Sequence, residues 1–276
     1  MTKPNPEFEF LISTMNRTDM DFLMPMFKHH NIDDLHILII NQTTKDKTLH
    51  SNQGNIRVIN DFEKHLSRSR NIGIKNSIGK ICFIADDDVE YLPNILDITK
   101  TAYEKFTDAA LISFQYVRED NNTCKNYKRN SGYQQDLLHK QNLSSIEISF
   151  KPSLIKSKHI RFNQLFGIGA VFKSCEEQVF RDDIARAGLK IAYVPKPIVK
   201  HFGETSTAGE NSKEYTRALV AQKYLLHKNL IYIWLSKYIW SLLKRKVIKR
   251  SQVKQFWKYG IEAVQDYKKH MAIQNQ

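Results

Sequence analysis

The chain has 276 residues, 41% of them hydrophobic, and a formal net charge of +13. This length allows one large core, or one core with a smaller appendage. The basic balance indicates a polyanionic partner, whether nucleic acid, an anionic membrane surface or a phosphorylated small molecule. The cysteines are three in number, far apart and without a CxxC pair, which argues against a zinc site and a disulfide framework and favours a reducing cytosol.

The sequence shows neither a secretion signal nor a membrane span. Residues 1–13 lack a charged region followed by a long apolar one. The longest apolar stretch, 230–243, is interrupted by Lys237 and is shorter than the roughly 20 residues that a spanning helix needs. We therefore expect a cytoplasmic protein without a spanning helix.

Short apolar runs alternate with segments of helical spacing in the first half of the chain. Each run has several apolar or β-branched residues and ends in a polar break, which is typical of a buried strand. We predict strands at 8–14, 35–41, 55–60 and 80–86, and helices within 18–30 and 67–78. This alternation favours an α/β fold with a mostly parallel sheet flanked by helices.

Polar segments follow three of these strands, at residues 13–17, 41–47 and 86–90. Ligands of parallel sheets bind beyond the carboxyl ends of the strands, where loops converge and helix N-termini point outward. The three segments should therefore meet at one rim of the sheet.

The second half is less regular. Residues 117–145 are polar and predict a long loop, a kind of segment that often covers a site. Strands are expected within 146–155, 165–174 and 189–203. Helical spacing over 175–188 ends at a glycine suited to a C-cap.

The composition changes at Lys223. The segment 223–276 carries twelve lysines and arginines against Glu262 and Asp266, so it holds a net +10 of the total +13. Apolar and aromatic residues recur at helical spacing beside these charges. We predict a folded domain at 1–222 and a basic amphipathic helical tail at 223–276 that lies on an anionic membrane surface. The alternative is a packed helical pair with solvated lysines.

Asp86, Asp87 and Asp88 directly follow an apolar strand. Adjacent carboxylates repel unless a cation neutralises them, and hard oxygen ligands suit Mg²⁺ or Mn²⁺. Asp86 and Asp88 can hold one divalent ion that also grips a diphosphate. The alternative is a solvated turn in which Asp88 caps a helix.

The stretch HLSRSRNIGIKNSIGKICFIADDDVEYLP closely resembles the inverting family-2 glycosyltransferases of the GT-A fold, in which a SxARNxG helix precedes a strand ending in DxD. The resemblance runs from LISTMNR to VPKPIVKH, roughly 190 residues. It implies a Rossmann-like, mostly parallel central sheet with flanking helices and a C-terminal helical tail. It also implies transfer of a sugar from a nucleotide-sugar donor.

The same resemblance assigns the aspartates. They match the DxD motif, with Asp88 as a direct metal ligand, Asp86 near the metal or the ribose, and Asp87 beside the nucleotide-sugar. His201 matches a position that often completes the metal site or touches the diphosphate, and neutral imidazole suits Mn²⁺. Mn²⁺ or Mg²⁺ is the implied cofactor. A histidine at a strand end otherwise serves a structural purpose.

The resemblance also implies that four further residues bind the nucleotide-sugar. Arg70 matches the arginine of the ARN segment, and the alternative is an exposed helix arginine. Ser13 and Thr14 match the family's PTYN position, without its proline. Asn41 stands where the family commonly has an aspartate that reads the base, which puts the identity of the nucleotide in doubt.

An inverting transfer needs a carboxylate that takes the proton of the acceptor hydroxyl. The family carries this base in an ED pair eleven residues before a glycine, and counting back from Gly188 gives Glu177, preceded by Glu176. Asp182 and Asp183 are a rival pair that we interpret as surface acids.

The expected partners are a nucleotide-sugar and a glycan or lipid-linked acceptor, at the inner face of the cell membrane in surface polysaccharide synthesis. A non-catalytic GT-A relative stays open because of Asn41. A nucleotidyltransferase normally has a glycine-rich phosphate loop near its N-terminus, which is missing here. A nucleic-acid-binding protein is disfavoured because the charge is segregated in the tail and no recognition motif occurs.

Overall fold

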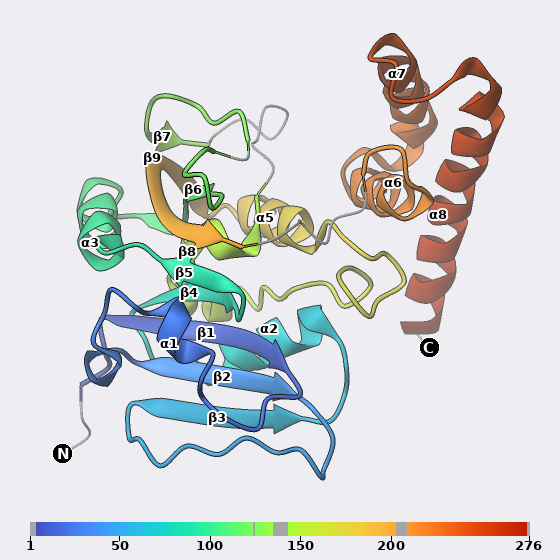
Figure 1. Ribbon diagram of the computed structural model, residues 1–276. Coiled ribbons are helices and arrows are strands. Elements are labelled where there is room, and N and C mark those ends of the chain that lie inside the picture. Colours follow the sequence, from blue (N-terminus) through green and yellow to red (C-terminus); the bar gives the residue numbers. More distant parts are fainter. Residues whose placement is uncertain (1–3, 124, 135–142, 203–208, 275–276) are drawn as a thin grey trace. The chain divides into compact units, whose positions relative to one another are not determined.

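The computed structural model describes the chain except for residues 1–3, 124, 135–142, 203–208 and 275–276 (Figure 1). It divides into two compact units. The sheet unit comprises Met1–Phe162 and Phe180–Gly203, and the helical unit comprises Asn163–Val179 and Glu204–Gln276. The helical unit thus begins before the predicted tail, and it includes a segment from the middle of the chain.

A nine-stranded sheet forms the centre of the sheet unit, in the order β3-β2-β1-β4-β8-β6-β9-β5, with β7 paired to β9. Strands β3, β2, β1 and β4 are parallel, as are β6 and β9, whereas β8, β5 and β7 run antiparallel to their neighbours. The strands are β1 Phe8–Met15, β2 Ile37–Gln42, β3 Ile56–Asp61, β4 Ile81–Asp86, β5 Val89–Tyr91, β6 Ala109–Val117, β7 Gly132–Tyr133, β8 Ile148–Phe150 and β9 Lys190–His201. The four strands predicted in the first half are therefore confirmed.

The sheet is buried on both faces. Phe10 and Ile12 of β1 belong to one hydrophobic core, and Leu11 between them belongs to a second. Successive side chains of a strand point to opposite faces, so these uninterrupted apolar runs fill two cores at once. The helices of this unit are α1 Leu23–Met26, α2 Leu66–Asn76, α3 Ile95–Lys105 and α4 Pro152–Ser157, and α5 Glu176–Arg186 continues into it from the helical unit.

Helix α2 packs closely on the sheet because of a glycine. A Cβ added to Gly73 would lie 3.2 Å from Ile40 Cδ1 and 3.5 Å from Leu11 Cβ. The absence of a side chain at this position lets the helix backbone approach β1 and β2. This contact fixes the helix that carries Arg70 against the strands that end at the rim.

Two predicted elements differ from the structure. The helix expected within 18–30 is the single turn α1, since Pro25 has no N–H to continue the helical bonds toward Asp21. The strand expected within 165–174 is a loop with one isolated bridge, because Gly167 and Gly169 adopt φ values of 103° and 86°, outside the strand region. Helix α3 and strand β6 lie where no element is predicted.

The predicted loop at 117–145 is largely irregular where the structure describes it. Strand β7 and an isolated bridge between Val117 and Thr123 are its regular pairings, and a short 3₁₀ helix, η2 Ser145–Glu147, follows it. Residues 124 and 135–142 lie outside the described part.

Helices α6 Lys213–His227, α7 Ile231–Lys244 and α8 Val253–Gln274 make up most of the helical unit. They share a hydrophobic core that includes Leu235, Ile239 and Phe256. A Cβ at Gly260 would lie 2.5 Å from Leu235 Cδ2, so α7 and α8 meet closely at this glycine. The helical tail is confirmed, as a packed unit, and the predicted boundary after residue 222 falls inside α6.

Among the described residues, no helix is both long and apolar enough to cross a bilayer.

Candidate active site

The strand register brings the predicted polar segments to one rim. Ser13 is aligned with Asp86 across β1 and β4, and Thr14 is aligned with Asn41 across β1 and β2. All three strands run parallel, so their carboxyl ends lie side by side. The prediction that these segments meet at one edge of the sheet is confirmed.

Asp86, the last residue of β4, is held by two donors. Arg70 lies 3.4 Å from its Oδ1, and the Ser145 hydroxyl donates to its Oδ2 over 3.1 Å. Burial raises the pKa of Asp86, and the Arg70 guanidinium opposes that shift. Arg70 is buried and lies over the ring of Phe162, 5.5 Å from its centre. The interpretation of Arg70 as an exposed helix arginine is therefore wrong.

Asp87 turns toward the loop after β1. Its Oδ2 accepts hydrogen bonds from the Thr14 hydroxyl and from Arg17 Nε, the latter over 2.8 Å. The Arg17 guanidinium also lies over the ring of Phe22. Arg17 is half-exposed at the rim. It is not among the predicted site residues, although it belongs to the polar segment 13–17 that was expected at this rim.

The Asn41 side chain holds the loop after β1 through two hydrogen bonds to the Arg17 backbone. Its Oδ1 accepts from the Arg17 backbone N–H over 3.0 Å, and its Nδ2 donates to the Arg17 carbonyl over 2.9 Å. The same Nδ2 lies 3.0 Å from Asn60 Oδ1, and the side chain is fully buried. The geometry gives Asn41 a structural task, and its contact with a base stays a prediction. The Ser13 hydroxyl accepts a hydrogen bond from Ser69 of α2 over 2.9 Å.

Asp88 faces His201. Their Oδ2 and Nε2 atoms are 3.4 Å apart, because Val89, next to Asp88, pairs with His201 across β5 and β9. This ion pair raises the pKa of His201, and burial opposes the shift. The Asp88 side chain is 57% exposed. Since a strand follows Asp88, the alternative in which it caps a helix is wrong.

The side chains of Asp88 and His201 suit a divalent metal ion that is also bound by a phosphate group. In the described part of the chain, no three His, Cys, Asp or Glu side chains are grouped closely enough to hold a metal by themselves. Asp88 and His201 nevertheless present oxygen and nitrogen donors to the same space. Mg²⁺ sites commonly use one or two carboxylates and take their remaining ligands from water and substrate phosphates. The residues therefore fit such an ion.

Glu177 lies in the first turn of α5 and is half-buried. It belongs to the helical unit, whereas the three aspartates and His201 belong to the sheet unit. Its role as the base stays a prediction. Asp182 is not a surface acid, because it is buried and pairs with Arg181 over 2.9 Å.

Comparison with known proteins gives the same fold. The family described as Glycosyl transferase family 2 matches residues 21–173, more than half of the chain. A structure of S. aureus TarS residues 1–349 with UDP-GlcNAc has a TM-score of 0.62 and 15% identity, covering 95% of this chain and 80% of that one. A second structure of S. aureus TarS residues 1–349 has a TM-score of 0.61 and 14% identity, covering 93% of this chain and 79% of that one. A search of curated proteins finds no match.

The sheet topology and these matches define a GT-A fold, with a mostly parallel α/β sheet and a C-terminal helical region. The chain belongs to glycosyl transferase family 2 and is a glycosyltransferase that uses a nucleotide-sugar donor. Enzymes of this fold typically depend on a divalent metal.

Replacing Arg70 by lysine is expected to lower kcat/KM by about 10- to 100-fold, because lysine lacks the planar guanidinium that holds the Asp86 carboxylate. Steady-state kinetics with the donor measure this effect. The control is Arg57→Lys, since Arg57 pairs with Glu9 at the amino ends of the strands. It should leave turnover unchanged. Equal losses in both variants would contradict the positioning of Asp86 by Arg70.

Proposed function

We propose that the chain is an inverting, Mn²⁺- or Mg²⁺-dependent glycosyltransferase of the hexosyltransferase type. It would transfer the sugar to a hydroxyl of a glycan or lipid-linked acceptor in surface polysaccharide synthesis. The observation that supports this most is the pairing of Asp88 with His201 at the carboxyl rim of a GT-A sheet, where β4 ends in Asp86.

The rim residues would have two roles in donor binding, which are to hold the metal ion and to position the residues that bind it. A divalent ion at Asp86, Asp88 and His201 would neutralise the diphosphate and so favour its departure. Arg70 and the Ser145 hydroxyl keep the Asp86 carboxylate in place.

The loop after β1 would line the nucleotide. Thr14 and Arg17 both bind Asp87, and Asn41 holds the backbone of Arg17. The proposed nucleotide-sugar contacts are Ser13, Thr14, Asn41, Arg70, Asp86 and Asp87, to which we add Arg17. Glu177 is the proposed base, which takes the proton of the acceptor hydroxyl as its oxygen attacks the anomeric carbon.

The proposed place of action is the cytoplasmic face of the cell membrane, with peripheral attachment through the C-terminal helices. Residues 223–276 carry a net charge of +10, which favours contact with anionic lipid. A lipid-linked acceptor would be presented at the same surface.

The test is donor binding and turnover across UDP-, GDP- and dTDP-sugars, with Mn²⁺ or with EDTA. EDTA should abolish metal-supported turnover. Glu177→Ala should keep donor binding and lower turnover by about 10²–10⁴-fold, as expected for loss of a general base. Asp183→Ala, on the same helix and paired with Arg186, is the matched control and should stay near wild type.

Failure of every donor to bind, with either metal, would contradict the proposal. Donor binding without turnover would favour a non-catalytic GT-A relative that binds nucleotide-sugar without transferring it. Turnover that Glu177→Ala leaves intact would remove Glu177 from the mechanism while leaving the metal site in place.

A further inference from the structure

Helix α7 is apolar on two sides. One side, with Leu235 and Ile239, faces the core of the helical unit and is fully buried. On the other side, Ile233 and Trp240 are 58% and 63% exposed, and Leu230, just before the helix, is 60% exposed. These three residues follow one another at intervals of three and seven positions, so they line one stripe of the helix. We call Leu230, Ile233, Lys237, Trp240 and Lys244 the outer stripe.

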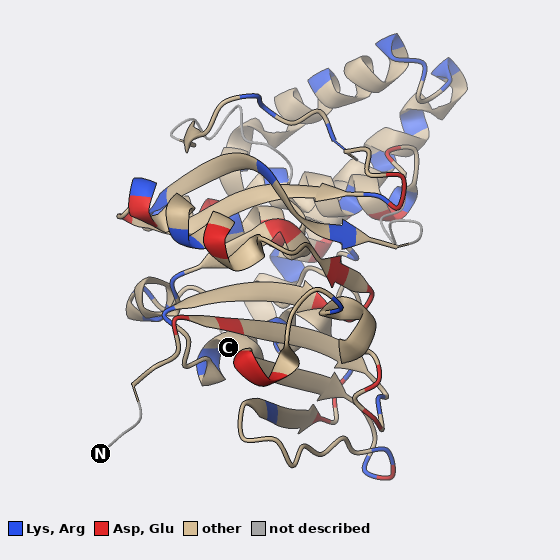
Figure 2. Cartoon of the chain, turned by 60° about the vertical axis from the view of Figure 1, so that its left-hand side comes forward, with Lys and Arg blue, Asp and Glu red and all other residues tan. Residues whose placement is uncertain are grey.

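The charges of the outer stripe are all positive. Lys237 and Lys244 are exposed between and after the apolar residues, and Lys244 Nζ lies 5.4 Å from the centre of the Trp240 ring. No aspartate or glutamate occurs in the sequence from Lys228 to Ile261. Figure 2 shows lysine and arginine recurring along the C-terminal helices.

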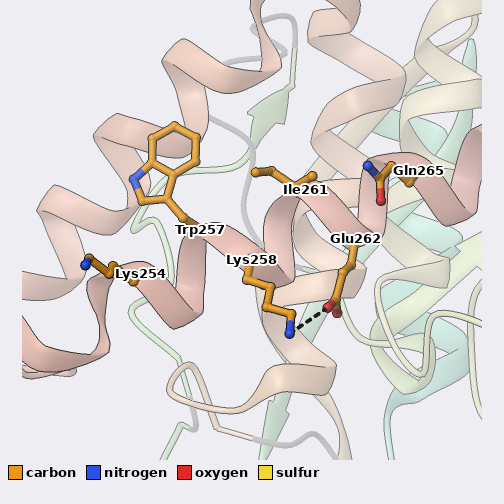
Figure 3. A pocket seen from close by; sticks show the side chains of 6 residues that line it. All are labelled: Lys254, Trp257, Lys258, Ile261, Glu262 and Gln265. Carbon is orange, nitrogen blue, oxygen red and sulfur yellow. Dashed lines mark ion pairs between the residues drawn. The ribbon is translucent and has the colours of Figure 1, made fainter.

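The exposed face of α8 differs from the outer stripe because it contains an acidic residue as well as lysines. A groove there is lined by Lys254, Trp257, Lys258, Ile261, Glu262 and Gln265 (Figure 3). Glu262 lies 4.0 Å from Lys258 and 3.3 Å from Arg217, so this face carries an acid beside its basic groups. Of these two exposed faces in the described part of the helical unit, the α7 face combines its lysines with an apolar stripe that contains no acid, whereas the α8 face contains Glu262.

We propose that the outer stripe of α7 binds the surface of an anionic bilayer, with Ile233 and Trp240 in the headgroup boundary. Large apolar side chains gain free energy by leaving water, and each nearby lysine gains from anionic lipid. Tryptophan suits the boundary because its ring is apolar and its N–H is polar. Nucleic acid would offer Leu230 and Ile233 no comparable apolar surface. The inference rests on the proposed function, whose membrane partner it assigns to one helix face.

The test is sedimentation of the full chain with vesicles of phosphatidylcholine alone or mixed with phosphatidylglycerol. Wild type should bind the mixed vesicles, with a blue shift of tryptophan fluorescence. Lys237→Gln/Lys244→Gln should weaken binding by about tenfold or more, since each charge contributes near an anionic surface. Ile233→Ser/Trp240→Ser should weaken it similarly, and should also abolish the blue shift.

Two control variants keep the result specific to this face. Lys254→Gln/Lys258→Gln removes the same two charges from α8, and Ile261→Ser removes an apolar side chain from its groove. Both should bind vesicles nearly as wild type does. All substituted residues of the outer stripe are exposed, so thermal unfolding should be unchanged.

Equal losses in the α7 and α8 charge variants would overturn the proposal, because binding would then follow net charge alone. Binding of an oligonucleotide that the α7 variants lose, without vesicle binding by wild type, would overturn it in favour of nucleic acid. Donor binding without vesicles distinguishes the two proposals. The α7 variants should bind donor as wild type does. If wild type itself binds no donor, the proposed function is contradicted and the vesicle result still stands.

Discussion

Replacing Asp88 by asparagine is expected to lower donor turnover by about 10²–10³-fold while leaving the fold intact. The carboxylate is 57% exposed and pairs with His201 at 3.4 Å, so the change removes a charge without opening a cavity. The amide keeps the shape of the side chain but loses the negative charge that an ion at the diphosphate requires. Steady-state turnover at increasing Mn²⁺ concentration is the measurement, and half-maximal activation should need more metal.

The matched control is Asp97→Asn, which removes an exposed carboxylate from the first turn of α3 in the same unit. It should leave turnover and the metal response unchanged. Asp88→Asn with a wild-type metal response would show that Asp88 is not a metal ligand. A lower unfolding temperature in Asp88→Asn would instead trace the loss to the fold.

The strands could be predicted from the sequence because the sheet is buried on both faces. Runs such as Phe10 to Ile12 supply one residue to each core in turn, so they contain no polar position that would blur their ends. The rim followed from the same pattern, since parallel strands end at one edge. The loop at 165–174 was mistaken for a strand because its apolar content hides the conformations of Gly167 and Gly169.

The side chains that hold the aspartates could not be predicted in this way. Arg17 binds Asp87 from 70 positions away, and Ser145 binds Asp86 from 59 positions away. Neither pair leaves a periodic or motif signal, because the partners come from segments that are far apart in the sequence and meet only in the folded chain. The resemblance to the family placed Asp86, Asp88 and His201 in one site without these contacts.

Glu147→Ala is expected to lower the free energy of unfolding by about 3 kcal/mol. Glu147 is buried, and its carboxylate accepts from Lys125 Nζ over 2.7 Å, from the Tyr127 hydroxyl over 2.6 Å and from the Ser144 N–H over 2.9 Å. Burial raises the pKa of Glu147, and Lys125 opposes the shift. Without the Glu147 carboxylate, the Lys125 ammonium loses its ion-pair partner. The hydrogen bond to the Ser144 N–H is lost as well, so η2, which contains Ser145, is held less firmly. Urea unfolding measures the loss.

The double variant Lys125→Met/Glu147→Ala separates the ion pair from other effects of truncation. Because Lys125 and Glu147 share one network, its destabilisation should be smaller than the sum of the two single variants by about 1 kcal/mol or more. Additive effects would show that the ion pair contributes little. Ser145→Ala removes the hydrogen bond to Asp86 without touching this network. It should therefore impair the response to Mn²⁺ with little loss of stability, whereas Glu147→Ala should impair both, because η2 links the buried ion pair to the rim.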